Sequence, residues 1–153
     1  GYDKVKKHVD NATSAGARIV TGGSGQTDDD NDVYYYEATV LADVTPHMLI
    51  MNEETFGPVA PVQRVSSDEE AVHYANQTPF GLASYVFTNN YARAFRAIEH
   101  LDYGIVGWND GVPSAAQAPF GGMKQSGVGR EGGSEGLEAY LETKYVSIGG
   151  LDQ

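Results

Sequence analysis

Apolar residues near the start of the chain recur at helical spacing. Within residues 2–15 they stand at i, i+4 and i+7 among lysines, which predicts an amphipathic helix that Gly16 ends. Two short β-rich runs follow, ARIVT at residues 17–21 and ATVLA at 38–42, and each predicts a strand. The polar, glycine- and aspartate-rich residues 22–32 between them predict a surface loop.

From residue 59 onward, predicted strands and helices alternate. The strands are expected at residues 59–65, 82–88, 105–108 and 144–148. Helix starts are expected at Thr45, at the capping box Ser67–Glu70, at Asn89 or Asn90, and at Ser134. Pro61 cannot donate a hydrogen bond to a neighbouring strand. The strand at residues 59–65 is therefore expected at a sheet edge, or Pro61 is expected near its start. The alternation predicts an α/β fold with a largely parallel sheet.

Length and composition narrow the class of protein. The chain has 153 residues, which suits a single domain over residues 1–153. Its net charge of −11 disfavours nucleic acid and anionic membranes as partners. No apolar run approaches the ~18 residues of a membrane span, and no leader pattern opens the chain, so a cytoplasmic location is expected. With no cysteine, the chain has no disulfide, thiolate zinc site or thiol nucleophile.

A glycine-rich stretch, PFGGMKQSGVGRE, occupies residues 119–131. Flexible linkers rarely contain a large aromatic residue and fixed charges, so Phe120, Lys124 and Arg130 favour an ordered loop. Its glycines continue into a G-x-G-x-x-G pattern, but no strand precedes that pattern and no full βαβ unit follows it. A dinucleotide-binding turn is therefore not expected there. The four histidines are scattered without metal-ligand spacing, so surface or half-buried positions and no metal site are expected.

Residues 52–58, NEETFGP, allow two interpretations. They could form a solvated acidic turn in which Phe56 fills the core. Alternatively, one carboxylate could accept two hydrogen bonds from a diol such as ribose, while the aromatic ring packs on a flat ring. Composition alone favours the solvated turn, and the diol interpretation stays open beside it.

Several blocks in a fixed order resemble the aldehyde dehydrogenase family. They are EETFGP at 53–58, ANQTPFGLASYVFT at 75–88, GIVGWN at 104–109 and the glycine-rich residues 119–131. The resemblance covers essentially the whole chain. Residues 34–45 and 137–148 are most similar to succinate-semialdehyde dehydrogenases within that family.

The resemblance implies a three-layer α/β/α catalytic domain and a reaction. Members of the family oxidise aldehydes to carboxylates with NAD or NADP. A cysteine thiolate attacks the aldehyde, the thiohemiacetal gives hydride to the nicotinamide, and water activated by a glutamate hydrolyses the thioester. The implied partner is a small aldehyde, succinate semialdehyde or a similar one.

Four residues receive roles from the resemblance. Glu54 would hold the hydroxyls of the nicotinamide ribose, and Phe56 would pack near the nicotinamide ring. Phe120 would line the aldehyde tunnel, and Ser114 would donate a hydrogen bond to the distal carboxylate of the substrate. A donor there is needed because a buried carboxylate without one is costly.

The family's cysteine, base, oxyanion residue and Rossmann domain all precede the matched part. No catalytic residue is therefore expected in this chain, which would be the C-terminal part of a catalytic domain. Alone, it is expected to show no turnover and weak or no cofactor binding. Residues 142–149 would form a strand donated to a neighbouring subunit in a homo-oligomer. Two alternatives stay open: a non-catalytic binding or assembly module, and a dehydrogenase for glutarate semialdehyde or a neutral aldehyde.

Overall fold

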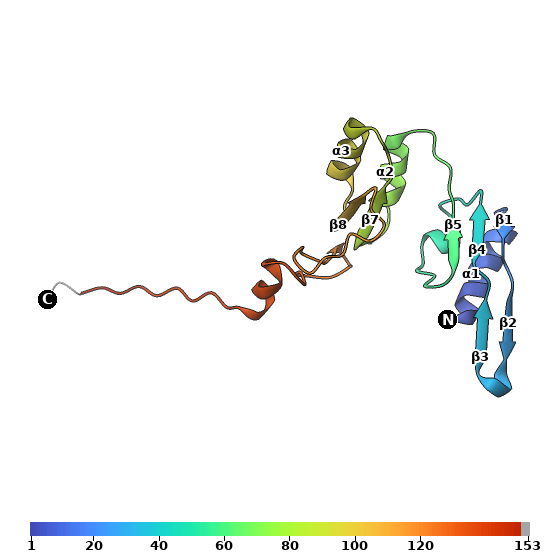
Figure 1. The fold of residues 1–153 in the computed structure, drawn as a ribbon, viewed down its shortest axis with the longest axis horizontal. Helices are drawn as coiled ribbons and strands as arrows, with labels where there is room; N and C mark the ends of the chain where they lie inside the picture. The colour runs from blue at the N-terminus through green and yellow to red at the C-terminus, as the bar shows by residue number, and fades with distance from the viewer. Residues whose placement is uncertain (151–153) are drawn as a thin grey trace. The chain divides into compact units, whose positions relative to one another are not determined.

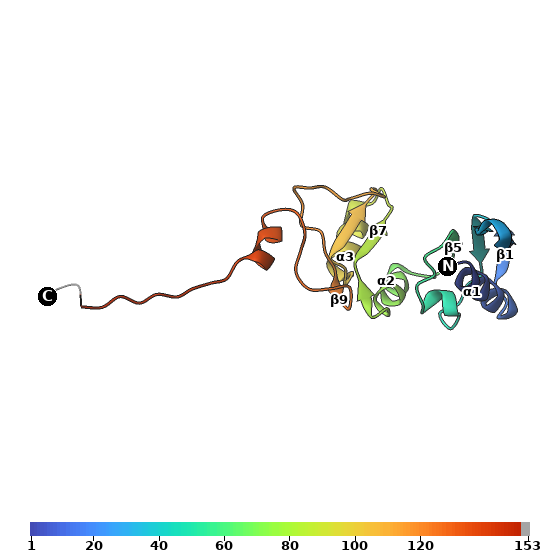
Figure 2. The same cartoon turned by 90° about the horizontal axis from the view of Figure 1, so that it is seen from below.

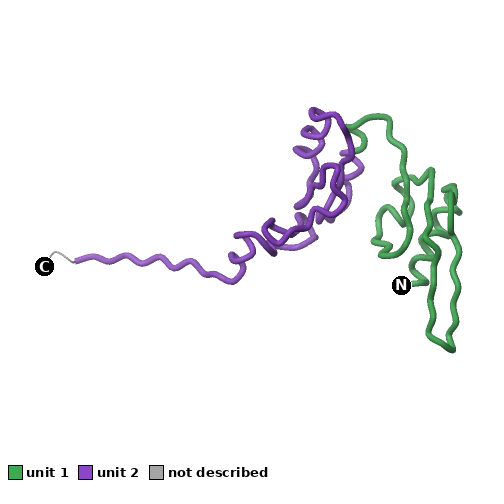
Figure 3. The backbone as a smooth tube through the Cα atoms, viewed as in Figure 1, with its two compact units in different colours: residues 1–71 green, residues 72–153 purple. Residues whose placement is uncertain are grey.

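The computed structural model describes residues 1–150, and the chain divides into two compact units, residues 1–71 and 72–153 (Figure 3). The single domain predicted over the whole chain stays a prediction. No helix within the described residues is both long and apolar enough to cross a membrane.

The first unit combines one helix with a three-stranded sheet (Figure 1). Its elements are α1 (Tyr2–Ser14), β1 (Arg18–Thr21), β4 (Thr39–Ala42) and β5 (Val59–Pro61). The strands lie in the order β1-β4-β5, antiparallel between the first two and parallel between the last two. Strand β5 is thus at an edge, where a proline such as Pro61 costs no ladder bond on its free side.

One apolar cluster joins α1 to this sheet. Its buried members are Val9, Ala12, Ala17, Leu41, Val44, Met48 and Ile50. The helix ends in a Schellman motif, because Gly16 has φ +104° and donates to the Thr13 carbonyl while Ala17 donates to the Ala12 carbonyl. The motif directs Ala17 into the core and the chain into β1, as the sequence predicts.

The loop predicted at residues 22–32 is wrong. Strands β2 (Gly25–Asp28) and β3 (Val33–Tyr36) form an antiparallel hairpin around a short 3-10 helix, η1 (Asp29–Asn31). The Asp28 carboxylate accepts hydrogen bonds from the Asn31 side chain and backbone, and the first of these lowers the pKa of Asp28. Asp28, the first residue of the acidic run, therefore stabilises the turn at Asp29–Asn31. The hairpin has little buried apolar surface, so hydrophobic alternation could not mark it.

The helix predicted to start at Thr45 is also wrong. A turn leads instead to a single 3-10 turn, η2 (Leu49–Met51). In an α-helix the Leu49 amide would donate to the Thr45 carbonyl, but here it donates to Asn11 Oδ1 of α1 at 2.9 Å. A tertiary contact has replaced the helical bond.

The second unit is built on a parallel pair, β7 (Ala83–Val86) and β8 (Ile105–Trp108), connected by α3 (Tyr91–His100). Figures 1 and 2 show α3 beside these strands. The Asn90 side chain accepts the Arg93 amide at 3.0 Å, which confirms the predicted cap. The Trp108 ring meets two aromatic rings of α3 edge-on, at centroid distances of 5.1 and 6.0 Å.

The capping box at the start of α2 (Asp68–Asn76) forms only in part. Ser67 Oγ accepts the Glu70 amide at 3.1 Å, but the Glu70 carboxylate bonds the amide and hydroxyl of Ser66 rather than the amide of Ser67. The helix still begins where the box predicts, because the Ser67 hydroxyl accepts an amide of its first turn.

A short antiparallel pair completes the second unit: β6 (Phe80–Gly81) and β9 (Met123–Lys124). The backbone at Gly104 passes so close to this region that a Cβ there would lie 1.9 Å from the Gly121 carbonyl oxygen. The α/β class is thus confirmed, with the strands of the described residues divided among four small sheets.

The end of the described chain differs from prediction. Ser134 caps no helix by a side-chain hydrogen bond, and a 3-10 helix, η3 (Glu135–Tyr140), follows it. Residues 141–150 contain no helix or strand, and their side chains are exposed. The prediction of a strand at residues 144–148 within this chain is therefore wrong, because no strand from residues 1–150 pairs with this segment. Its addition to a neighbouring subunit stays a prediction.

Candidate functional site

The four residues predicted to face cofactor or substrate fall into different units. Glu54 and Phe56 belong to the first unit, and Ser114 and Phe120 belong to the second.

Residues 52–58 form a loop between η2 and β5. Hydrogen bonds of Asn52, two residues before Glu54, hold the start of this loop in place. The Asn52 amide group donates to the carbonyls of Pro46, at 2.7 Å, and Met48, at 3.0 Å. These two bonds wrap the preceding turn around the Asn52 side chain. The loop therefore leaves η2 in one defined direction.

Phe56 does not fill the core, so that part of the solvated-turn interpretation is wrong. Its side chain is 86% exposed and its φ is +42°, a left-handed conformation that costs a non-glycine residue about 1–2 kcal/mol. Such strained residues concentrate at functional sites. Glu54 is also exposed, and its carboxylate has no hydrogen-bond partner among residues 1–150. A free double acceptor beside a free ring fits the ribose and the planar ring of a nicotinamide cofactor.

A pocket of about 690 Å³ lies beside this loop. Phe56 and Pro58 line it together with Tyr2 and the tyrosines at 34–36. The Tyr2 and Tyr36 rings meet edge to face, with centroids 5.7 Å apart. The loop thus opens onto an aromatic surface on which planar groups can pack.

The glycine-rich stretch is an ordered loop, as predicted. Phe120 and Glu131 exchange two backbone hydrogen bonds of 2.7 Å, which close its neck. The Arg130 guanidinium donates to the carbonyls of two of its glycines, at 3.0 and 2.7 Å. Gly127 and Gly129 have φ of +122° and +79°, which explains why glycine is required at these turns.

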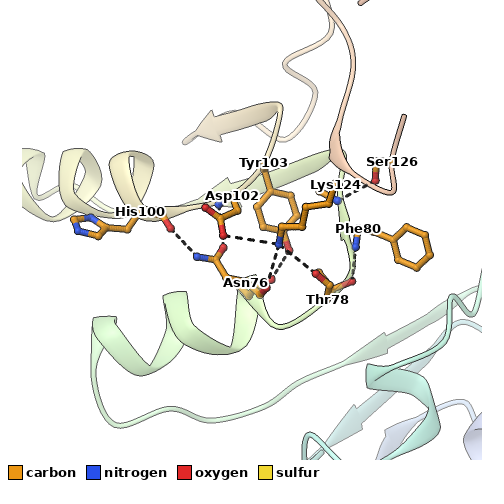
Figure 4. Close-up of polar contacts among 10 residues, drawn as sticks. Asn76, Thr78, Phe80, His100, Asp102, Tyr103, Lys124 and Ser126 are labelled. Carbon is orange, nitrogen blue, oxygen red and sulfur yellow. Dashed lines mark hydrogen bonds and ion pairs between the residues drawn. The ribbon is translucent and has the colours of Figure 1, made fainter. Parts of the chain in front are cut away.

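Lys124 fastens this loop to the rest of the second unit (Figure 4). Its ammonium group donates to the carbonyls of Asn76, at 3.0 Å, and Thr78, at 3.2 Å, where α2 ends. The Asp102 carboxylate lies 4.0 Å from it, and the Tyr103 ring centroid 5.7 Å. A positive charge at the C-terminal end of a helix also complements the helix dipole.

The residues after Lys124 add two further attachments. Ser126 Oγ accepts the Gly81 amide at 2.9 Å, and the Gln125 amide donates to the Pro79 carbonyl at 3.0 Å. The tip of the loop is thus docked on the turn and strand that follow α2.

A second set of hydrogen bonds holds together the ends of α2 and α3, next to Lys124. The Asn76 side chain donates to the His100 carbonyl at 2.7 Å and accepts the Asp102 amide at 3.0 Å, which ties the end of α2 to the end of α3 (Figure 4). The Tyr103 hydroxyl donates to the Ala75 carbonyl at 2.6 Å. Burial, and secondarily the charge of Asp102, raises the pKa of Tyr103.

Phe120 lines a pocket of about 830 Å³ formed largely by the glycine-rich loop and η3. Leu82, Leu137 and Tyr140 supply further apolar walls. Ser114 does not line this pocket; it lies exposed in the loop of residues 109–118. Phe120 therefore lines a pocket and Ser114 does not. The roles of Phe120 and Ser114 in substrate binding stay predictions.

The chain supplies no thiol nucleophile, because it has no cysteine. No three His, Asp or Glu side chains of residues 1–150 are grouped so that they could hold a metal ion. Sequence reasoning missed His8, which is fully buried and contacts the loop that carries Glu54. The signal was present: His8 stands with Val5, Val9 and Ala12 on the apolar face of α1.

Known proteins match nearly the whole chain. A model of the aldehyde dehydrogenase family matches residues 1–146. The mitochondrial succinate-semialdehyde dehydrogenase of Arabidopsis thaliana is 47% identical over 98% of this chain and 28% of its own length. The 3-sulfolactaldehyde dehydrogenase of Pseudomonas putida is 47% identical over 98% of this chain and 30% of its own length. The chain thus spans less than a third of these relatives.

Solved structures agree with that assignment. Succinate-semialdehyde dehydrogenase from Burkholderia pseudomallei superposes with a TM-score of 0.84 at 45% identity, over 91% of this chain and 28% of that one. Betaine aldehyde dehydrogenase from Staphylococcus aureus, solved with NAD+, gives a TM-score of 0.85 at 42% identity, over 94% and 29%. By sequence and by structure, the chain belongs to the aldehyde dehydrogenase family.

Proposed function

We propose that this chain is part of an NAD(P)-dependent aldehyde dehydrogenase that oxidises succinate semialdehyde, or a similar acid-bearing aldehyde, to the carboxylate. The observation that carries the proposal is the chemistry shared by two relatives at 47% identity. One is named for an aldehyde that ends in a carboxylate and the other for an aldehyde with a sulfonate. An anionic group distant from the aldehyde is common to both.

Within the proposal, Ser114 recognises the anionic end and Phe120 lines the path of the aldehyde. A serine hydroxyl can donate to a carboxylate or sulfonate oxygen, and such a charge-assisted bond is about twice as strong as a neutral one. Ser114 lies in an exposed loop, so its hydroxyl is accessible to a ligand.

The cofactor side of the proposal rests on the loop of residues 52–58. Glu54 would accept from the two ribose hydroxyls, and the exposed Phe56 ring would pack against the nicotinamide. When bound, NAD(P) supplies the hydride acceptor of the oxidation. The nucleophile would come from a part of the enzyme outside this chain, so the chain alone is expected to show no turnover.

The test uses the complete protein that contains this chain. Formation of NADH or NADPH and of the acid product is measured with succinate semialdehyde, glutarate semialdehyde, butanal and betaine aldehyde, with each cofactor in turn. The value of kcat/KM should be about 10–100 times higher for succinate semialdehyde than for butanal, as expected for one hydrogen bond to a charged group. No turnover of any aldehyde would overturn the proposal, and a preference for butanal or betaine aldehyde would overturn the acid-bearing substrate.

A further inference from the structure

Helix α1 presents a row of three side chains to residues 49–57, the segment that carries Glu54. Val5, His8 and Asn11 stand three residues apart and therefore lie on one side of the helix. Each of the three meets a different part of the segment. Together they hold its start, its middle and its end.

His8 makes the central contact and has no exposed surface. Its Nδ1 lies 3.0 Å from the Thr55 hydroxyl, and its Nε2 lies 3.3 Å from a Glu53 carboxylate oxygen. A carboxylate only accepts, which assigns the N–H to Nε2; in the neutral ring, Nδ1 then accepts the Thr55 hydroxyl proton. One rigid ring therefore bonds both neighbours of Glu54.

The two outer contacts limit movement of the segment ends. Asn11 Oδ1 accepts the Leu49 amide at 2.9 Å. At Gly57, a Cβ would lie 2.4 Å from the Val5 side chain, so the backbone rests directly on α1. Between these contacts, the side chains of Glu54 and Phe56 are exposed and can meet a ligand.

We propose that His8 is a positioning residue for the cofactor: it fixes the backbone on both sides of Glu54, so that the carboxylate is already oriented for the ribose. This inference rests on the proposed function, because it takes Glu54 as a cofactor contact. His8 itself does not touch the cofactor. Preorganisation lowers the entropy lost on binding, so its loss weakens cofactor binding without altering the aldehyde site.

The experiment compares four variants of the complete protein. His8→Leu removes both bonds, whereas His8→Gln and His8→Asn each retain an amide that can reach one of the two partners. Val9→Ala is the matched control, because Val9 is also buried on α1 but belongs to the core under the sheet. The readouts are the Kd of NAD+ and NADP+ by calorimetry, the KM for cofactor and for aldehyde, and amide exchange of residues 49–58.

His8→Leu should raise the cofactor Kd roughly five- to tenfold, the value of about one hydrogen bond, and leave the aldehyde KM within about twofold. It should also speed amide exchange in residues 49–58, and the Gln and Asn variants should fall between it and wild type. Val9→Ala should lower the melting temperature and leave the Kd unchanged. An unchanged Kd in His8→Leu, or the same Kd change in Val9→Ala, would overturn the inference.

Two outcomes need separate tests. If His8→Leu does not fold, Thr55→Val removes one of the two bonds at a half-buried site and should raise the Kd about two- to fivefold, while an unchanged value overturns the inference. If the wild-type protein binds neither cofactor, the proposed function fails. Amide exchange then still shows whether His8 holds residues 49–58, and unchanged exchange in His8→Leu overturns that part as well.

Discussion

Replacing Lys124 with methionine tests whether this residue holds the glycine-rich loop in place. Methionine keeps most of the length and the apolar stem, but it cannot donate to the carbonyls of Asn76 and Thr78. The loop would keep its own neck, the bridge between Phe120 and Glu131. Its tip would lose its charged attachment to the end of α2.

The expected magnitude follows from the contacts. The Lys124 side chain is 26% exposed, so each of its two bonds is expected to contribute about 1 kcal/mol, less than a buried charge-assisted bond, or about 2 kcal/mol together. The Asp102 carboxylate, 4.0 Å away and 63% exposed, adds little. A loss of about 2 kcal/mol in the free energy of local opening corresponds to roughly 30-fold faster amide exchange.

Hydrogen exchange of the complete protein measures this directly. The informative amides are those of Gln125 and Ser126 at the tip of the loop, and that of Gly81, which donates to Ser126 Oγ. The Ile105 amide, bonded to Leu82 between the parallel strands, should exchange as in wild type. Lys7→Met, an exposed change on α1, is the matched control. Wild-type exchange at the amides of Gly81, Gln125 and Ser126 in a folded Lys124→Met protein would refute the role of Lys124.

Three further predictions concern single groups. Ser114→Ala should lower kcat/KM for succinate semialdehyde by about tenfold or more and for butanal by less than about twofold; equal losses would argue against recognition of the anion. Gly104→Ala should lower the stability of the complete protein by at least about 1–3 kcal/mol in urea unfolding, because its Cβ would meet the Gly121 carbonyl at 1.9 Å; unchanged stability would show that this close approach is absent. Since burial raises the pKa of Tyr103 above the ordinary 10.0, the unfolded chain ionises first and the stability held below pH 10.0 is lost as pH rises through the folded value. Tyr103→Phe should reduce that alkaline loss, and an equally steep loss in the variant would contradict the assignment.

Elements with local signals could be predicted from the sequence. The apolar spacing of α1, its stop at Gly16 and the cap at Asn90 each depend on residues within one or two turns. Order in the glycine-rich loop was also predictable, because Lys124 and Arg130 are residues that a linker does not need. The partners of Lys124, main-chain carbonyls distant in sequence, were not predictable.

The incorrect predictions share a dependence on distant partners. The hairpin of β2 and β3 has a backbone ladder without a buried face, so its residues carry no alternation. The Thr45 helix does not form because Asn11 takes the Leu49 amide. The strand expected at residues 144–148 has no neighbour within the described chain. For the candidate site, the family motifs predict Glu54 and Phe56, and their roles stay predictions. Only the structure shows that His8 contacts both neighbours of Glu54.

A crystal structure of the complete protein with NAD(P) bound tests the cofactor role of residues 52–58 most directly. We expect the Glu54 carboxylate within about 3 Å of the nicotinamide ribose hydroxyls, with the Phe56 ring against the nicotinamide and His8 still bonded to Glu53 and Thr55. A structure in which another carboxylate holds that ribose, with Glu54 and Phe56 facing solvent, would contradict it.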